Sequence, residues 1–259
     1  PDTKGGVKFN PDGTLDRGAM LTIMNPDDKA GLEAALRLKD QYGAEVTVVT
    51  MGLPKAEEVL REAIAMGADK GILVTDRVLG GADTWATSQT LAGAIRNLEY
   101  DLIITGRQAI DGDTAQVGPQ VAEKLGLTQV TYAEEILNVE KTTGRVVVKR
   151  HIDGGVETVE GPLPIVITVN GSAAPCRPRN AKLVQKYKRA LGAQEKAAIT
   201  KEGATLPYAD IYEKCPYLNI TEWSVADVNG DLAQCGLSGS PTKVKAIQNI
   251  SFQAKESRT

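Results

Sequence analysis

The segment 106–118, GRQAIDGDTAQVG, holds the residue types best suited to binding a phosphorylated ligand. A short apolar run precedes it and a helical pattern follows it, which predicts a loop that leads into a helix. Free backbone N–H groups at the start of a helix bind anions, and Gly112 would let a ligand approach the backbone closely. Arg107 adds a charge for contact with a phosphate. The composition is therefore compatible with a phosphate or ribose site in this loop.

The same loop also permits a purely structural interpretation. Asp113 and Gln116 have the spacing of a capping box, in which two side chains satisfy N–H groups at the start of a helix. Asp111 and Asp113 would also repel an anion that approached the loop. A capped helix with no ligand therefore stays open as an alternative.

A second polar segment, 76–92, follows another short apolar run. Asp83 is placed to cap a helix, and the hydroxyl groups of Thr84, Thr87 and Ser88 fall close together at the start of that helix. Such hydroxyl groups suit a polar ligand such as a phosphate or a ribityl chain. The alternative is that these small side chains only allow two helices to pack closely.

The third candidate is the basic segment 177–189, RPRNAKLVQKYKR, which has six basic residues and no acid. It predicts either a solvated surface or a docking element for an acidic protein, since complementary charges steer association. The chain as a whole has 30 basic and 33 acidic residues and a net charge of −3. This balance disfavours nucleic acid as the partner.

Several other classes of site lack the residues that they need. His151 is the only histidine, which disfavours a zinc site and a Ser-His-Asp triad, and the stretch around it is strand-like. The three cysteines form no C-x-x-C pair. The chain also has neither a G-x-x-x-x-G-K-[ST] nor a G-x-G-x-x-G motif, which disfavours a P-loop ATPase and a conventional dinucleotide-binding dehydrogenase.

The elements that must position these segments alternate along residues 26–126. Helical spacing predicts helices over 26–42, 54–66, 84–98 and 114–125. Short apolar or β-branched runs predict strands over 45–50, 71–75 and 101–105. Strands that alternate with helices predict an α/β fold, with a parallel sheet and helices on both faces. Ligands bind such sheets at the carboxyl ends of the strands, so the loops 51–54, 76–84 and 106–113 should lie at the site.

After residue 127 the pattern changes to strands separated by turns. Runs at 136–139, 145–149 and 157–159 predict an antiparallel hairpin or meander. The apolar run 165–169 is expected to return to the main sheet. The tail 190–259 has too little periodic apolar sequence to bury a core alone, so we expect it to lie against a larger surface.

Taken together, several stretches resemble the β subunit of electron transfer flavoproteins. They are Asn25-Pro26, the run 106–118 with its following helix, Gly154-Gly155 before Leu163-Pro164, and Gly239-Ser240-Pro241-Thr242. The resemblance extends from residue 1 to about residue 244. It implies a Rossmann-like nucleotide-binding domain over 1–189 with an antiparallel hairpin insertion, and an extended C-terminal arm over 190–259 that embraces an FAD-holding α subunit. The family usually begins with an apolar strand that is absent here, so we expect the first strand to be missing.

The resemblance also implies which residues bind cofactor and partner. The expected cofactor-binding residues are Asn25, Pro26, Asp27, Val48, Asp76, Asp83, Thr84, Ala86, Thr87, Ser88, Gly106, Arg107, Gln108, Ala109, Ile110, Asp111, Gly112, Asp113, Thr114, Ala115, Gln116 and Val117. The residues expected to dock a flavin-dependent dehydrogenase are Arg177, Arg179, Lys182 and Lys186. We expect no catalytic acid, base or nucleophile and no metal site.

The family has two branches that differ in the ligand of the β subunit. One keeps AMP as a structural ligand, and the other, mostly anaerobic, holds FAD there and performs electron bifurcation. The segment 76–92 is similar to the bifurcating branch, which implies FAD. In that branch a hydride from NADH reaches the β-subunit flavin, one electron passes to ferredoxin or flavodoxin, and the other passes through the α subunit to a dehydrogenase. The route can also run in reverse.

Three hypotheses therefore follow for the function. The first is a bifurcating electron transfer flavoprotein β subunit with FAD, and the second is a simple electron carrier of the same family with AMP. The third is a regulatory module that senses adenine nucleotides. Because no apolar run approaches the ~20 residues that cross a bilayer, we expect no membrane span and a cytoplasmic protein.

Overall fold

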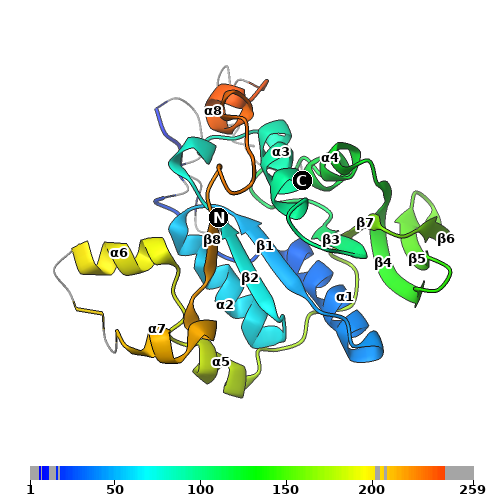
Figure 1. Ribbon diagram of the computed structural model, residues 1–259. Coiled ribbons are helices and arrows are strands. Elements are labelled where there is room, and N and C mark those ends of the chain that lie inside the picture. Colours follow the sequence, from blue (N-terminus) through cyan, green and yellow to red (C-terminus); the bar gives the residue numbers. More distant parts are fainter. Residues whose placement is uncertain are drawn as a thin grey trace, which may run out of the picture.

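The computed structural model describes residues 6, 8–11, 16, 18–201, 205–206 and 209–242 (Figure 1). Within these residues, helices and strands form an α/β fold with parallel strand pairs. Hydrogen bonds divide the strands into two open sheets, where the sequence led us to expect one main sheet. The sequence pattern locates strands, but it does not determine which strands become neighbours.

The smaller sheet has the strand order β1-β2-β8 and is parallel. The elements of residues 26–95 are α1 (Pro26–Tyr42), β1 (Thr47–Met51), η1 (Pro54–Ala56), α2 (Glu57–Met66), β2 (Lys70–Val74), η2 (Arg77–Leu79) and α3 (Thr84–Ile95), and β8 (Thr221–Trp223) completes the smaller sheet. On β2, Leu73 packs with Leu60 of α2, whereas Val74 packs with Ala94 of α3. Successive side chains of a strand point to opposite faces, so α2 and α3 cover opposite faces of this sheet.

The larger sheet has the strand order β3-β7-β4-β5-β6. Its elements are β3 (Leu102–Gly106), α4 (Val117–Leu125), β4 (Thr128–Glu140), β5 (Arg145–Ile152), β6 (Gly155–Pro162) and β7 (Ile165–Val169). β7 lies parallel to both β3 and β4, and β4, β5 and β6 form an antiparallel meander. Ile167 packs with Ala30 of α1, and Val166 packs with Ala122 of α4, so helices again cover both faces.

Most of the predicted elements are confirmed. The helix over 26–42 has the predicted bounds, because Pro26 begins it and Gly43 ends it in a left-handed conformation with φ of 68°. The meander is confirmed with longer strands, and the run 165–169 returns to the sheet as β7, with all five residues buried. Two helices are shorter than predicted, since α3 ends at Ile95 and α4 begins at Val117.

The described residues after β7 pack on the same domain. Their elements are α5 (Ala181–Tyr187), α6 (Ala193–Lys201), α7 (Ile211–Lys214), η3 (Pro216–Leu218), η4 (Leu232–Gln234) and α8 (Gly236–Gly239). Leu218 and Ile220 pack with Leu60 and Leu73, and Val225 and Val228 extend the cluster around Val74. The strand β8 was not predicted. The domain boundary at residue 189 and the contact with an α subunit stay predictions.

Candidate nucleotide-binding site

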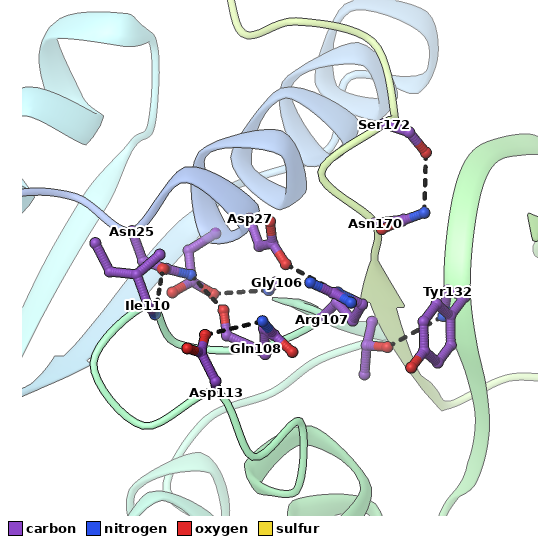
Figure 2. Close-up of polar contacts among 12 residues, drawn as sticks. Asn25, Asp27, Gly106, Arg107, Gln108, Ile110, Asp113, Tyr132, Asn170 and Ser172 are labelled. Atoms are coloured by element: carbon purple, nitrogen blue, oxygen red, sulfur yellow. Dashed lines mark hydrogen bonds and ion pairs between the residues drawn. The ribbon is translucent and has the colours of Figure 1, made fainter. Parts of the chain in front are cut away.

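The loop after β3 is fastened to the start of α1 by the side chain of Asn25 (Figure 2). The Asn25 Nδ2 donates to the carbonyl oxygen of Gln108 at 2.7 Å, and Ile110 N donates to Asn25 Oδ1 at 3.0 Å. Asn25 occupies the predicted cap position of α1, but its side chain makes no capping hydrogen bond. The amide instead holds two backbone groups of the loop 106–113.

Close contact between β3 and α1 requires glycine at position 106. A Cβ atom there would lie 2.4 Å from Asp28 N and 2.5 Å from the carbonyl carbon of Asp27. Gly106 N donates to Asp28 Oδ1 at 2.7 Å. Although the Asp28 residue as a whole is exposed, desolvation by the surrounding protein raises the pKa of its carboxyl, against the lowering effect of the hydrogen bonds from Gly106 and Asn25. The sequence analysis did not identify Asp28 as a site residue. Its one local signal is that it is the second acidic residue in the first turn of α1.

Arg107 makes two contacts within the chain, an ion pair with Asp27 and a cation–π contact with Tyr132. Its Nε lies 3.2 Å from Asp27 Oδ2, and its guanidinium carbon lies 5.7 Å from the centre of the Tyr132 ring. Tyr132 was also missed. It lies at an irregularity of β4 and has a left-handed φ of 57°, which no local sequence signal indicates. Arg107 therefore keeps its place, while part of its charge is balanced by Asp27.

The predicted capping box at the start of α4 is wrong. Asp113 and Ala115 have φ values of 49° and 52°, which cannot continue a right-handed helix, so α4 begins only at Val117. Asp113 accepts from Gln108 Nε2 at 3.0 Å instead. Gln116 precedes the helix without a side-chain capping bond.

Part of the loop is open to a ligand. Gly112, Asp113, Thr114 and Gln116 are exposed. A Cβ atom added at Gly112 would meet no other atom within 4 Å. The backbone here can therefore be approached closely, as the sequence predicted for this glycine.

The second polar segment meets this loop through α3. Asp83 caps α3 as predicted, since its Oδ1 accepts from Ala86 N at 2.9 Å. The Thr84 hydroxyl donates to Gln116 Oε1 at 2.8 Å, so the two predicted cofactor segments are in direct contact. Ser88 is buried, and its hydroxyl lies 2.9 Å from Gln120 Oε1 on α4. Ser88 thus lies in the contact between α3 and α4, which agrees with the alternative that the small side chains of this segment allow helices to pack closely.

The pKa of Asp83 is lowered. Partial burial would raise this pKa, but N–H groups of Ala86 and Thr242 donate to the carboxylate and outweigh the burial. The ionised form of Asp83 is therefore stabilised by two segments of the chain at once.

Three further predicted cofactor residues lie on β1, on α3 and at the start of η2. Val48 is half-buried on β1 against the core, and Ala86 is buried in α3. Asp76 accepts from Val78 N at 3.2 Å and starts η2. Contact of any residue in the set with a cofactor stays a prediction.

The basic segment lies on and before α5, at the other end of the molecule from α8 (Figure 1). Arg177 is bound within the chain, with Nε 2.9 Å from Glu33 Oε2 and Nη2 2.9 Å from Asp40 Oδ2. Lys186 lies 4.7 Å from the centre of the Tyr217 ring. Arg179, Lys182 and Lys186 are exposed, so these three residues are better placed than Arg177 to contact a partner. The docking surface itself stays a prediction.

Other kinds of site gain no support among the residues that the structure describes. No group of three His, Cys, Asp or Glu residues there could hold a metal ion, and no helix there is long and apolar enough to span a bilayer. His151 is half-exposed on β5, with Nδ1 3.6 Å from Glu134 Oε1. Its place on a strand agrees with the structural interpretation of this histidine.

Comparison with known proteins identifies the family of the chain. The family model of the electron transfer flavoprotein domain matches residues 13–205. The chain is 43% identical over 246 residues to the electron transfer flavoprotein subunit beta of Clostridium acetobutylicum, covering 95% of this chain and 83% of the relative. It is 53% identical over 171 residues to the acryloyl-CoA reductase electron transfer subunit gamma of Anaerotignum propionicum, covering 65% and 63%.

A third relative, the caffeyl-CoA reductase-Etf complex subunit CarD of Acetobacterium woodii, is 42% identical over 247 residues, covering 94% of this chain and 82% of the relative. The first and third relatives match nearly the whole chain, and the family model includes both the loop 106–118 and the segment 76–92. The chain belongs to the electron transfer flavoprotein family, among its β subunits.

Proposed function

We propose that this chain is the β subunit of an electron-bifurcating electron transfer flavoprotein and that it binds FAD. The observation that carries the proposal is the hydrogen bond from Thr84 to Gln116. It joins the loop 106–117 and the start of α3 into one polar surface. AMP needs only a site for an adenosine and one phosphate, whereas the longer FAD needs a second polar segment for its ribityl chain and second phosphate.

The residues of this surface fit a flavin nucleotide. The open backbone at Gly112 suits the nucleotide half, while Thr84 and Thr87 suit the polar chain that leads to the flavin. Asn25 and Asp28 fix the loop before any ligand arrives, which lowers the entropic cost of binding. Bound FAD supplies hydride and single-electron chemistry, and the protein contributes position and electrostatics.

The proposed partners are those of a bifurcating complex. The chain pairs with an α subunit that holds a second FAD, and electrons pass between NADH, ferredoxin or flavodoxin, and a flavin-dependent dehydrogenase in the cytoplasm. The names of two relatives, an acryloyl-CoA reductase subunit and a caffeyl-CoA reductase complex subunit, support a dehydrogenase that acts on a CoA thioester.

The second candidate function is a simple electron carrier with AMP in the same loop. The observation that favours it is that Asn25 and Asp28 fix the loop 106–113 without any contribution from α3. A small nucleotide can therefore use this loop alone.

Ligand stoichiometry separates the two functions. The α–β heterodimer is purified and denatured, and the released FAD and AMP are quantified by chromatography. Two FAD and no AMP per heterodimer support the proposal, and one FAD with one AMP would overturn it. In a Thr87→Phe variant, we expect the second FAD to be lost because the larger side chain stands beside Thr84. Unchanged FAD content in that variant would count against the role of α3.

A further inference from the structure

The segment Gly236–Thr242 carries a family-like motif, yet the proposed function gives it no role. It lies against the loop 76–83, about 150 residues earlier in the chain, and Figure 1 shows α8 beside α3. Leu237 N donates to the carbonyl oxygen of Gly80 at 2.9 Å. This contact holds the middle of the loop that precedes α3.

Ser240 holds the end of the same loop. Its side chain is almost completely buried, with the residue 5% exposed. Ser240 Oγ accepts from Asp83 N at 2.8 Å and donates to the carbonyl oxygen of Gly236 at 2.7 Å. The hydroxyl therefore accepts from the residue that caps α3 and, by donating to Gly236, is itself fixed within the C-terminal segment.

The carboxylate of Asp83 completes the connection. Thr242 N donates to Asp83 Oδ2 at 2.9 Å, while Asp83 Oδ1 accepts from Ala86 N at the same distance. One oxygen of the Asp83 carboxylate thus accepts a hydrogen bond from the C-terminal segment, and the other accepts one from the start of α3. At the opposite end of the loop, Val225 N approaches Asp76 Oδ2 at 3.4 Å.

The two backbones fit together closely enough to require glycine. Gly236 has a left-handed φ of 58°, and a Cβ atom there would lie 1.9 Å from the Val78 carbonyl oxygen. Gly81 has φ of 72°, and its added Cβ would lie 3.0 Å from Leu237 Cβ. The contact is therefore specific to one geometry of the loop and is not a loose surface association.

We propose that Gly236–Thr242 is a clasp that positions the loop 76–83 and, through Asp83, the nucleotide-binding start of α3. Ser240 and Thr242 are then positioning residues, since they reach the ligand only through Asp83 and Thr84. This inference depends on the proposed function in one respect, namely that α3 contacts the bound nucleotide. Release of the clasp should loosen α3 and speed the loss of that nucleotide.

The test uses the purified α–β heterodimer with Ser240→Ala, which removes the bonds to Asp83 and Gly236. The matched control is Ser238→Ala, because the Ser238 hydroxyl donates to the carbonyl of Cys235, the residue just before the segment. We measure amide hydrogen exchange in peptides covering 77–88 and 145–162, together with the rate at which nucleotide leaves the β subunit after dilution. Loss of a buried hydrogen bond should speed exchange in 77–88 and nucleotide loss by about five- to tenfold, with 145–162 and the control unchanged.

Each result decides the proposal. If residues 77–88 exchange in Ser240→Ala at the wild-type rate, the proposed clasp is overturned. Faster exchange with an unchanged rate of nucleotide loss would overturn its positioning role. A wild-type heterodimer without nucleotide in the β subunit would refute the proposed function, while the exchange data would still test the clasp. If Ser240→Ala does not fold, Thr242→Pro is the second variant. It removes the N–H and the hydroxyl that reach Asp83, at an exposed residue, and the same outcomes apply.

Discussion

The hydroxyl of Thr84 donates to Gln116 Oε1 at 2.8 Å, although the two residues lie 32 positions apart. Thr84 begins α3 and Gln116 immediately precedes α4, so the bond joins the starts of two helices. Both helices follow strands whose carboxyl ends should carry the ligand in a parallel α/β sheet. This pair therefore marks the place where the two predicted cofactor segments become one surface.

Replacement of Thr84 by valine tests that surface. Thr84→Val keeps the shape but removes the hydroxyl that contacts Gln116, so we expect the β-subunit nucleotide to dissociate about five- to tenfold faster. The FAD of the α subunit should stay bound and serves as the internal control. The measurement is the rise of free flavin fluorescence after dilution of the heterodimer. An unchanged dissociation rate would show that this bond does not support the ligand.

Replacement of Gly106 tests the contact of β3 with α1. Gly106→Ala places a Cβ 2.4 Å from Asp28 N, so we expect a loss of about 1–3 kcal/mol in the free energy of unfolding. Gly112→Ala is the matched control, because an added Cβ there meets no atom within 4 Å. Urea denaturation of both variants without added nucleotide gives the comparison. Equal stability of the two variants would contradict the close contact.

The ion pair between Glu33 and Arg177 predicts a loss of stability in acid. Partial burial would raise the pKa of Glu33, but hydrogen bonds from the Arg177 side chain and backbone and from Arg37 lower it to about 2. Because the folded-state pKa lies below the unfolded value of 4.5, the stabilisation is complete above pH 4.5. It is lost as the pH falls toward 2, by roughly 3 kcal/mol.

Urea unfolding of the wild type and Glu33→Gln between pH 7 and pH 3 measures this contribution. We expect the variant to be less stable at pH 7 and to lose less stability on acidification. Parallel curves for the two proteins would refute the role of Glu33. Lys141→Gln, at an exposed ion pair with Asp101, is the control and should change little.

Charge reversal tests the docking surface at α5. Lys182→Glu and Lys186→Glu should slow association with the dehydrogenase by about tenfold at low salt, and the difference should shrink as salt screens the charges. Lys70→Glu, an exposed charge on β2, is the control. Stopped-flow association of the heterodimer with its dehydrogenase gives the rates. If all three variants associate equally slowly, the effect is one of net charge and the surface is not specific.

Local sequence patterns were sufficient to predict much of the secondary structure. The helix over 26–42 and the strand over 165–169 follow from apolar spacing, and Asp83 was predicted to cap α3 because a cap needs only neighbouring residues. The capping box at Asp113 failed for the complementary reason. Its spacing was right, but the left-handed backbone at Asp113 and Ala115 arises from the path of the whole loop.

The sequence by itself determined the succession of helices and strands, the open glycine of the loop 106–118 and the resemblance to the family, because these depend on residues close together in the chain. The tertiary structure decided which strands are neighbours and where the polar side chains are used. Asn25 bonds a residue 83 positions away, Arg177 one 144 away and Thr242 one 159 away. Such bonds form only when packing brings distant segments together, and no local periodicity encodes their partners.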